Sequence, residues 1–281
     1  MGRAEDGAGQ RKEPNRAVPA VQSSGDSGGT LLMRNEPKLR AILFDVDGTL
    51  IDTVHLIVRA LDYTYRKHLG IALPHEEIRR LIGLPLHVQM HYLDDKLSHP
   101  VDHAQMEQDE RAYYEAHRHQ ERVIPEMLEA VRCAKQRGYR TALVTSKNQR
   151  EYAVSRPQLQ LDDWIDAIVT ADDTECHKPH PDPVFKALER LEVAPESAIY
   201  IGDTVYDITC GRSAGTLVAS VAWGAHLPED LRAAQPDYFF EQPNDALEWI
   251  QSLPRIDDDG TTQEDSFRVH TLPLFRGSYQ K

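Results

Sequence analysis

The sequence predicts an α/β fold: a doubly wound, Rossmann-like parallel sheet with an all-helical segment inserted after its first strand. Short apolar runs alternate with longer amphipathic stretches, which is the pattern of βα units in a parallel sheet. About ninety residues separate the first apolar run from the second, far more than an ordinary crossover needs. Because this interval has helical periodicity, we expect a helical cap beside the sheet.

Five runs are short, apolar throughout and followed by polar residues, as expected of strands that helices cover on both faces. The expected strands are Arg40–Asp45, Tyr139–Thr145, Ala167–Thr170, Ala198–Gly202 and Leu217–Ala222. Helices fit between them. One begins at Pro125, which suits a first helical turn, and ends at Gly138; another spans about Pro183 to Leu191, and a third follows Asp203.

The interval after the first strand is expected to form a cap of residues 54–121, and residues 38–53 and 122–254 the core. Apolar residues recur at spacings of three and four from Val54 to Leu69, and Gly70 follows as a stop signal. Further cap helices are expected over His75–Ile82, Pro85–Leu93 and Asp102–Gln120. A cap at this point lies over the carboxyl ends of the strands, where open α/β sheets bind ligands.

The two ends of the chain differ in composition from the rest. Residues 1–37 contain no aromatic side chain and are rich in glycine, so we expect a disordered tail. Residues 255–281 are polar and contain the run Asp257-Asp258-Asp259-Gly260, so we expect a loosely ordered extension.

Charge and cysteine content narrow the function classes. The chain has 32 basic and 45 acidic residues, a formal net charge of −13. Such a surface repels nucleic acids and anionic lipids, so neither is an expected partner. The three cysteines fit neither a disulfide framework nor a paired metal motif. With no apolar run that suits a signal peptide, we expect a cytoplasmic monomer or homodimer that acts on, or binds, a small molecule.

Polar residues follow the expected strands where each strand ends. Asp45 and Asp47 come directly after the first strand and before Gly48, and neighbouring carboxylates are costly to desolvate unless a cation or a reaction needs them. The other polar groups at strand ends or in the following loops are Thr145, Ser146, Lys147, Lys178, Asp203 and Asp207. Because the strand ends meet at one edge of a parallel sheet, these side chains should converge.

This order of motifs resembles the haloacid dehalogenase-like superfamily, and specifically its phosphatases with a helical, C1-type cap. The resemblance covers about residues 40–250. It extends to the phosphoglycolate phosphatases and the related pyrophosphatases through the runs Ile168–Asp173, Lys178–Pro183 and Val221–Gly224.

The resemblance implies a catalytic role for each matching residue. Asp45 would be the nucleophile that forms an aspartyl-phosphate, and Asp47 the general acid and base. Lys178 would neutralise the nucleophile and a phosphate oxygen, while Thr145 and Ser146 donate hydrogen bonds to the phosphate.

The resemblance also implies Mg²⁺ as cofactor, because a carboxylate that attacks a phosphate needs a cation to offset charge repulsion. The expected metal ligands are Asp45, Asp203 and the backbone carbonyl of Asp47, with Asp207 holding the waters of the ion. Residues that could reach the substrate from the cap or its border are Arg79, Arg80, His87 and Lys147.

The predicted function is a Mg²⁺-dependent phosphatase of a small phosphorylated metabolite, with 2-phosphoglycolate as the first candidate and inorganic pyrophosphate as the alternative. A phosphosugar mutase is less expected, because those relatives have a cap histidine where this sequence has Ile57. A non-catalytic binding protein is less expected because Asp45, Asp47 and Lys178 are all present.

Histidines at helical spacing raise the question of a zinc site. The pairs His87/His91 and His99/His103 have i,i+4 spacing, but no glutamate accompanies them in an HExxH arrangement, and Pro100 interrupts the second pair. Neither pair is expected to form a zinc site.

Overall fold

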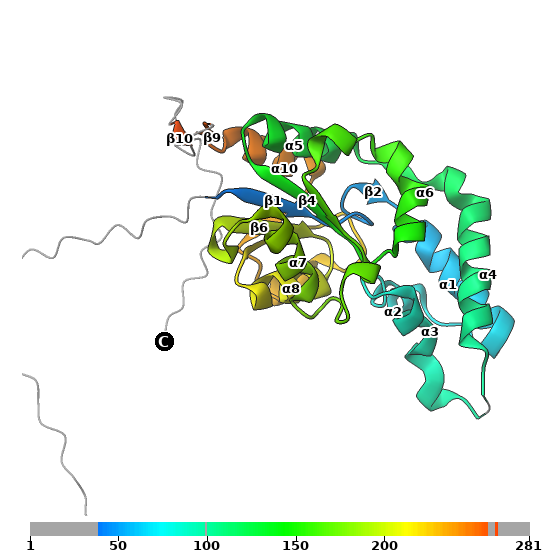
Figure 1. Ribbon diagram of the computed structural model, residues 1–281. Coiled ribbons are helices and arrows are strands. Elements are labelled where there is room, and N and C mark those ends of the chain that lie inside the picture. Colours follow the sequence, from blue (N-terminus) through cyan, green and yellow to red (C-terminus); the bar gives the residue numbers. More distant parts are fainter. Residues whose placement is uncertain (1–38, 99, 258–261, 264–281) are drawn as a thin grey trace, which may run out of the picture. The chain divides into compact units, whose positions relative to one another are not determined.

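The computed structural model describes residues 39–98, 100–257 and 262–263, and its centre is a parallel sheet of six strands in the order β5-β4-β1-β6-β7-β8 (Figure 1). The strands are β1 (Ala41–Phe44), β4 (Arg140–Val144), β5 (Ala167–Val169), β6 (Ala198–Gly202), β7 (Leu217–Val221) and β8 (Tyr238–Phe240). The first five match the predicted strands and confirm the α/β fold class. The edge strand β8 was not predicted, because three aromatic residues are too short a run to distinguish a strand.

Helices cover both faces of this sheet, because successive strand residues point to opposite sides. The helices of the core are α5 (Pro125–Gln136), α6 (Gln149–Leu159), α7 (Asp182–Leu191), α8 (Val205–Ala214), α9 (Pro228–Ala233) and α10 (Pro243–Ser252). Helices α5 and α10 lie on one face of the sheet, and α7 and α8 on the other (Figure 1). Ile42 and Phe44 of β1 belong to a buried cluster with α5 and α10, while Ala41 and Leu43 belong to another with α7 and α8. Three short 3-10 helices complete the core: η3 (Asp162–Trp164), η4 (Ala171–Asp173) and η5 (Pro195–Ser197).

A two-stranded antiparallel ribbon joins the core to the cap. Its strands are β2 (Ile51–Asp52) and β3 (Arg122–Val123), with Ile51 opposite Val123. The described residues between these strands contain helices: α1 (Val54–Leu69), α2 (His75–Arg79), α3 (Leu86–Met90), η1 (His91–Lys96), α4 (His103–His117) and η2 (Arg118–Gln120). The two connections between core and cap therefore lie side by side. Strands of only two residues cannot be recognised in the sequence, so this pairing was not predicted.

The cap has an apolar cluster of its own, distinct from those on the two faces of the sheet. Leu61 and Tyr65 of α1 pack there with Ile78 and Met106, and all four are fully buried. The Tyr65 hydroxyl donates a hydrogen bond of 2.7 Å to the carbonyl of Gln89, which satisfies a polar group that burial would otherwise penalise.

Only part of the two predicted tails falls within the described residues. The predicted disordered segment 1–37 lies outside them. In the C-terminal extension, β9 (Arg255–Ile256) pairs antiparallel with β10 (Thr262–Gln263), and the Ile256 amide donates to the carbonyl of Arg137 on the core at 2.8 Å. None of the helices in the described part of the chain is both long and apolar enough to cross a bilayer.

Removing the side chain of Leu43 should destabilise the fold strongly. Leu43 is fully buried in β1 between β4 and β6, so Leu43→Ala leaves a cavity and should lower the free energy of unfolding by about 2–5 kcal/mol. Urea denaturation measures the effect, with Phe185→Ala as the matched control because Phe185 is 46% exposed on α7. Equal losses in the two variants would contradict this assignment of the core.

Candidate active site

A buried ammonium group lies between carboxylates at the carboxyl edge of the sheet. Lys178 Nζ is 2.7 Å from Asp45 Oδ1 and 2.8 Å from Asp207 Oδ1. Asp45 directly follows β1, Asp207 lies in the first turn of α8 after β6, and Lys178 is in the loop before α7. The parallel sheet therefore brings together three residues that are far apart in the sequence, as the motif order predicts.

Asp203 completes this group, which we call the carboxylate–lysine cluster (Asp45, Lys178, Asp203 and Asp207). It is fully buried directly after β6, and it accepts hydrogen bonds from the Ala225 amide at 2.6 Å and from the Thr49 hydroxyl at 3.3 Å. The backbone approaches it so closely that a Cβ at Gly48 or Gly224 would overlap with Asp203. Gly48 also has φ +75°, so a side chain there would be both strained and obstructed.

The charges of this cluster do not balance internally. Burial disfavours a charged lysine, yet Asp207 and Asp45 outweigh burial and raise the pKa of Lys178. Burial also raises the pKa of Asp45 to about 7, although Lys178 opposes the shift. Burial, and then the charges of Asp45 and Asp207, raise the pKa of Asp203 well above its ordinary range. One lysine facing three carboxylates leaves two negative charges to be compensated when all are ionised.

The donor set fits a hard divalent cation. One carboxylate oxygen each from Asp45, Asp203 and Asp207 lies within 4.8 Å of the others, and all three residues are buried. Oxygen ligands and an excess of two negative charges are what Mg²⁺ prefers. The carboxylate of Asp47 does not belong to this group. The metal contact of its backbone carbonyl stays a prediction.

Asp47 points away from the carboxylate–lysine cluster although only Val46 separates it from Asp45. Its Oδ1 accepts a hydrogen bond of 2.7 Å from the Thr53 hydroxyl. Lys147 Nζ lies 2.6 Å from Asp47 Oδ1 and 2.5 Å from Oδ2, so the ammonium holds both oxygens. Two carboxylates of one turn thus face different partners, which is the separation that a nucleophile and a proton-transfer group require.

Thr145 and Ser146 follow β4 and border the same space, but their hydroxyls are engaged differently. Thr145 is buried, and its Oγ1 accepts a hydrogen bond of 3.2 Å from the Lys147 amide, which leaves its proton available to another acceptor. Ser146 Oγ donates at 2.6 Å to the carbonyl of Gly83 in the cap. In this arrangement Ser146 links core and cap, whereas the Thr145 hydroxyl keeps a hydrogen that it can donate to another acceptor.

A cavity of about 890 Å³ opens onto Asp45 and Asp47 between core and cap. Its core wall includes Thr145, Ser146 and Lys147. Its cap wall includes Ile57, Gly83, Glu110, Arg111 and Tyr114. The predicted nucleophile and acid–base group therefore both border one cavity, which is partly open to solvent.

Three of these cap residues, all on α4, were not predicted as site residues: Glu110, Arg111 and Tyr114. Arg111 donates to Glu107 and to Glu151 of α6, both at 2.8 Å, and so ties the cap wall to the core. The Tyr114 ring centroid lies 5.4 Å from Lys147 Nζ. Helical spacing marks these positions as one face of α4, but only the docking of α4 reveals that this face lines the cavity.

Arg79, Arg80 and His87, which sequence reasoning offered as substrate contacts, lie outside the lining of this cavity. Arg79 donates from Nε to the Ala225 carbonyl at 2.8 Å and from Nη2 to the Gly224 carbonyl at 2.9 Å. It therefore holds the cap to the loop that cradles Asp203. Arg80 and His87 are exposed, and the His87 ring packs edge-on against His177. Of the four candidates, Lys147 alone reaches the cavity.

Comparison with known proteins places this chain among hydrolases. The family described as haloacid dehalogenase-like hydrolase matches residues 42–221. A relative from Caldanaerobacter subterraneus subsp. tengcongensis, provisionally named pyrophosphatase PpaX, is 38% identical over 225 residues, which cover 79% of this chain and 98% of the relative. Pyrophosphatase PpaX from Bacillus cereus is 33% identical over 222 residues, which cover 78% of this chain and 99% of that relative.

A solved structure shares the fold at lower identity. The crystal structure of a predicted phosphoglycolate phosphatase from Haemophilus somnus 129pt superimposes with a TM-score of 0.67 at 20% identity. The match covers 76% of this chain and 98% of that one. At this identity the likeness concerns the fold.

Substituting Glu110 should change how stability depends on pH. Glu110 is 6% exposed, and burial, followed by the charge of Glu151, raises its pKa from 4.5 to about 8. The folded protein therefore keeps a proton that the unfolded chain releases, so wild-type stability falls as pH rises from about 4.5 to about 8. Glu110→Gln has no such proton to lose. Its free energy of unfolding should therefore rise relative to that of wild type, by about 2–4 kcal/mol, as the pH increases from about 4.5 to about 8.

Urea unfolding of both proteins at several pH values measures that difference. Glu115→Gln is the matched control, because Glu115 lies on the same helix with 56% of its side chain exposed. If the stability of Glu110→Gln ran parallel to that of wild type at every pH, Glu110 would not be a buried protonated acid.

Proposed function

The chain belongs to the haloacid dehalogenase-like hydrolases, and from this premise we propose that it is a Mg²⁺-dependent phosphohydrolase that forms an aspartyl-phosphate on Asp45. The family is the one that the motif order predicted. The proposal is supported above all by the divergence of Asp45 and Asp47, which place one carboxylate in the carboxylate–lysine cluster and the other on Lys147. Both carboxylates border the cavity.

In the first step, a carboxylate oxygen of Asp45 attacks phosphorus, and the bond from phosphorus to the leaving oxygen breaks. Asp47 donates its proton to that oxygen, so the leaving group departs without a full negative charge. Lys178 holds Asp45 in place and offsets its charge. Asp45, Asp203 and Asp207 would hold Mg²⁺, which would supply positive charge to offset the repulsion between the attacking carboxylate and the phosphate.

In the second step, water attacks phosphorus and the bond to Asp45 breaks, which releases phosphate and restores the carboxylate. Asp47, now deprotonated, accepts the proton of that water. In both steps the Thr145 hydroxyl donates a hydrogen bond to a phosphate oxygen. Its hydrogen is available for this bond because its oxygen accepts from the Lys147 amide.

Lys147 couples substrate binding to this proton transfer. Without substrate its ammonium holds both oxygens of Asp47. A phosphate anion in the cavity competes for the same ammonium. When Lys147 moves to the phosphate, the Asp47 carboxyl group is freed to face the leaving oxygen.

For the substrate, we place inorganic pyrophosphate first and 2-phosphoglycolate second. The relatives named PpaX are 38% and 33% identical and match over nearly their full length, whereas the phosphoglycolate phosphatase likeness rests on 20% identity. Ile57 lines the cavity at the position where mutases have a histidine, which favours hydrolysis over phosphoryl return to a sugar.

A substrate panel tests this choice directly. Phosphate release with Mg²⁺ should give the highest kcat/KM for pyrophosphate when it is compared with phosphoglycolate, sugar phosphates and nucleotides. A preference for phosphoglycolate would reverse the order of the two substrates, but the protein would still be a phosphohydrolase. Turnover of none of them would contradict the proposal itself.

Replacing the nucleophile should abolish turnover without unfolding the protein. Asp45→Asn keeps the side-chain volume but removes the attacking carboxylate and a metal ligand, so kcat should fall at least about 10⁴-fold. Circular dichroism should remain that of wild type. Asp52→Asn, at an aspartate whose side chain is 52% exposed in β2, is the control and should retain activity. Substantial hydrolysis by Asp45→Asn would exclude the covalent mechanism.

The loss of activity when the proton-transfer group, Asp47, is replaced should depend on the leaving group of the substrate. Asp47→Asn should lower kcat about 10²–10⁴-fold for an alkyl phosphate, but slow the first step less for an aryl phosphate, whose phenol leaves without protonation. Phenol should then appear before phosphate in rapid-quench experiments, because the second step still lacks its base. Mg²⁺ affinity should stay close to that of wild type, and its collapse would make the Asp47 carboxylate a metal ligand instead.

A further inference from the structure

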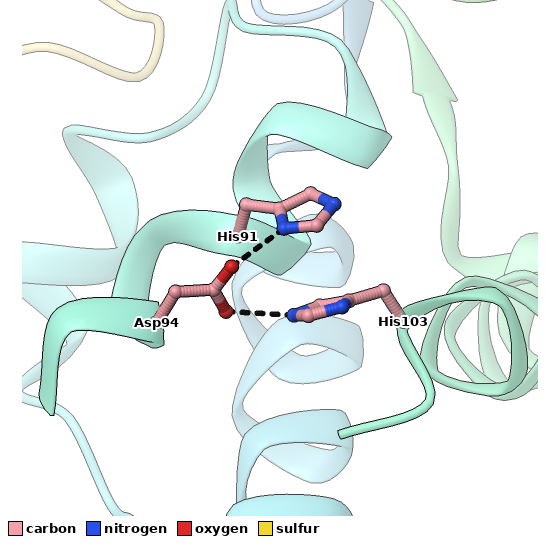
Figure 2. Close-up of side chains that lie close together, drawn as sticks. All are labelled: His91, Asp94 and His103. Atoms are coloured by element: carbon pink, nitrogen blue, oxygen red, sulfur yellow. Dashed lines mark hydrogen bonds and ion pairs between the residues drawn. The ribbon is translucent and has the colours of Figure 1, made fainter. Parts of the chain in front are cut away.

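Two histidines and an aspartate of the cap form a second group of possible metal ligands (Figure 2). His91 Nδ1 lies 2.6 Å from Asp94 Oδ2, and His103 Nε2 lies 2.7 Å from Asp94 Oδ1. His91 and Asp94 belong to η1, and His103 is the first residue of α4. We call these three residues the cap histidine cluster.

The side chains of the cap histidine cluster converge from two elements rather than from one helix face. The two imidazole rings stack with centroids 3.8 Å apart and an interplanar angle of 27°, so both rings turn a nitrogen toward the same carboxylate (Figure 2). The three ligand atoms all lie within 4.8 Å of one another. Tetrahedral zinc has ligand distances of about 2.0–2.2 Å, which puts its ligands about 3.3 Å apart. Small side-chain rotations would therefore bring these atoms to that spacing.

The chemistry of the donors selects a different metal from the one at the carboxylate–lysine cluster. Two imidazole nitrogens and one carboxylate oxygen suit Zn²⁺, Cu²⁺ or Ni²⁺, whereas an all-carboxylate set suits Mg²⁺. The side chains of His91, Asp94 and His103 are 54%, 39% and 22% exposed, so solvent can reach the site and a water can complete the coordination. The backbone under His103 is also fixed, because Asp102 caps α4 by accepting from the Gln105 amide at 3.0 Å.

The arrangement of the cap histidine cluster leaves its ligand atoms facing one another. A single carboxylate faces two stacked imidazoles, and each of its oxygens lies within hydrogen-bond distance of one ring nitrogen. A metal ion replaces the shared protons and binds both imidazoles in their neutral form.

We propose that His91, Asp94 and His103 bind one divalent transition-metal ion, with Zn²⁺ as the ion of choice, and that this ion joins η1 to α4. The prediction against zinc considered pairs of histidines at helical spacing, but the cap histidine cluster takes one histidine from each pair, twelve positions apart. Because Glu110, Arg111 and Tyr114 of α4 form the cap wall of the cavity, the ion would also hold that wall in place. The proposal does not depend on the catalytic assignment.

Isothermal titration of the full chain with zinc chloride tests the site, with excess Mg²⁺ present to occupy the carboxylate–lysine cluster. Wild type should bind one equivalent of Zn²⁺. His103→Gln and His91→Gln should each weaken this binding by about tenfold or more. His55→Gln is the matched control, because His55 is an exposed histidine 3.6 Å from Asp52 without a second imidazole, and it should bind Zn²⁺ like wild type.

Two further readouts separate a zinc site from a surface ion-pair network. Co²⁺ in place of Zn²⁺ should give the visible absorption bands of a four-coordinate nitrogen and oxygen site, and His103→Gln should lose them. Zn²⁺ should raise the thermal unfolding midpoint of wild type and of His55→Gln but not of His103→Gln. Zinc binding of equal strength in wild type and both cap histidine variants, or no zinc binding once Mg²⁺ is present, would overturn the proposal.

Discussion

The contact on which the active site depends is the buried ion pair network of Lys178 with Asp45 and Asp207. An ammonium group out of contact with water is tolerated only when carboxylates surround it, and removing a partner from such a pair typically costs about 3–5 kcal/mol. The same geometry sets the chemistry. With Asp203 adjacent, the negative charges outnumber the positive one, an excess that a hard divalent cation would relieve. The same four side chains therefore bear on the stability of the fold and on the proposed metal site.

The core and the cap contribute different parts of the candidate active site. Neighbouring parallel strands β1, β4 and β6 bring Asp45, Thr145 and Asp203 to one edge of the sheet, where backbone ladders fix the end of each strand. The cap contributes the far wall of the cavity, and polar contacts of Arg79, Arg111 and Ser146 are among those that join it to the core. Ala225 of the core also packs into the apolar cluster of the cap.

Sequence reasoning succeeded where a residue's place follows from the sheet. Asp45, Lys178, Asp203 and Asp207 converge because strand ends in a parallel sheet must meet, and five strands could be read from apolar runs. It failed where position depends on how the cap docks. Arg79 was offered as a residue that could reach the substrate, and in this structure it donates to the Ala225 carbonyl; Glu110 was not considered although it lines the cavity. Likewise, no helical spacing relates His91 to His103, so only the folded cap brings them together.

The covalent role of Asp45 is the central claim, and direct identification of the phosphorylated residue tests it. Wild-type protein mixed with substrate and Mg²⁺ is quenched in acid within a turnover, reduced with borodeuteride and digested for mass spectrometry. If Asp45 is the nucleophile, its acyl phosphate is converted to deuterated homoserine at that position, and at no other aspartate. Turnover without any such conversion, or conversion at Asp47, Asp203 or Asp207, would contradict it.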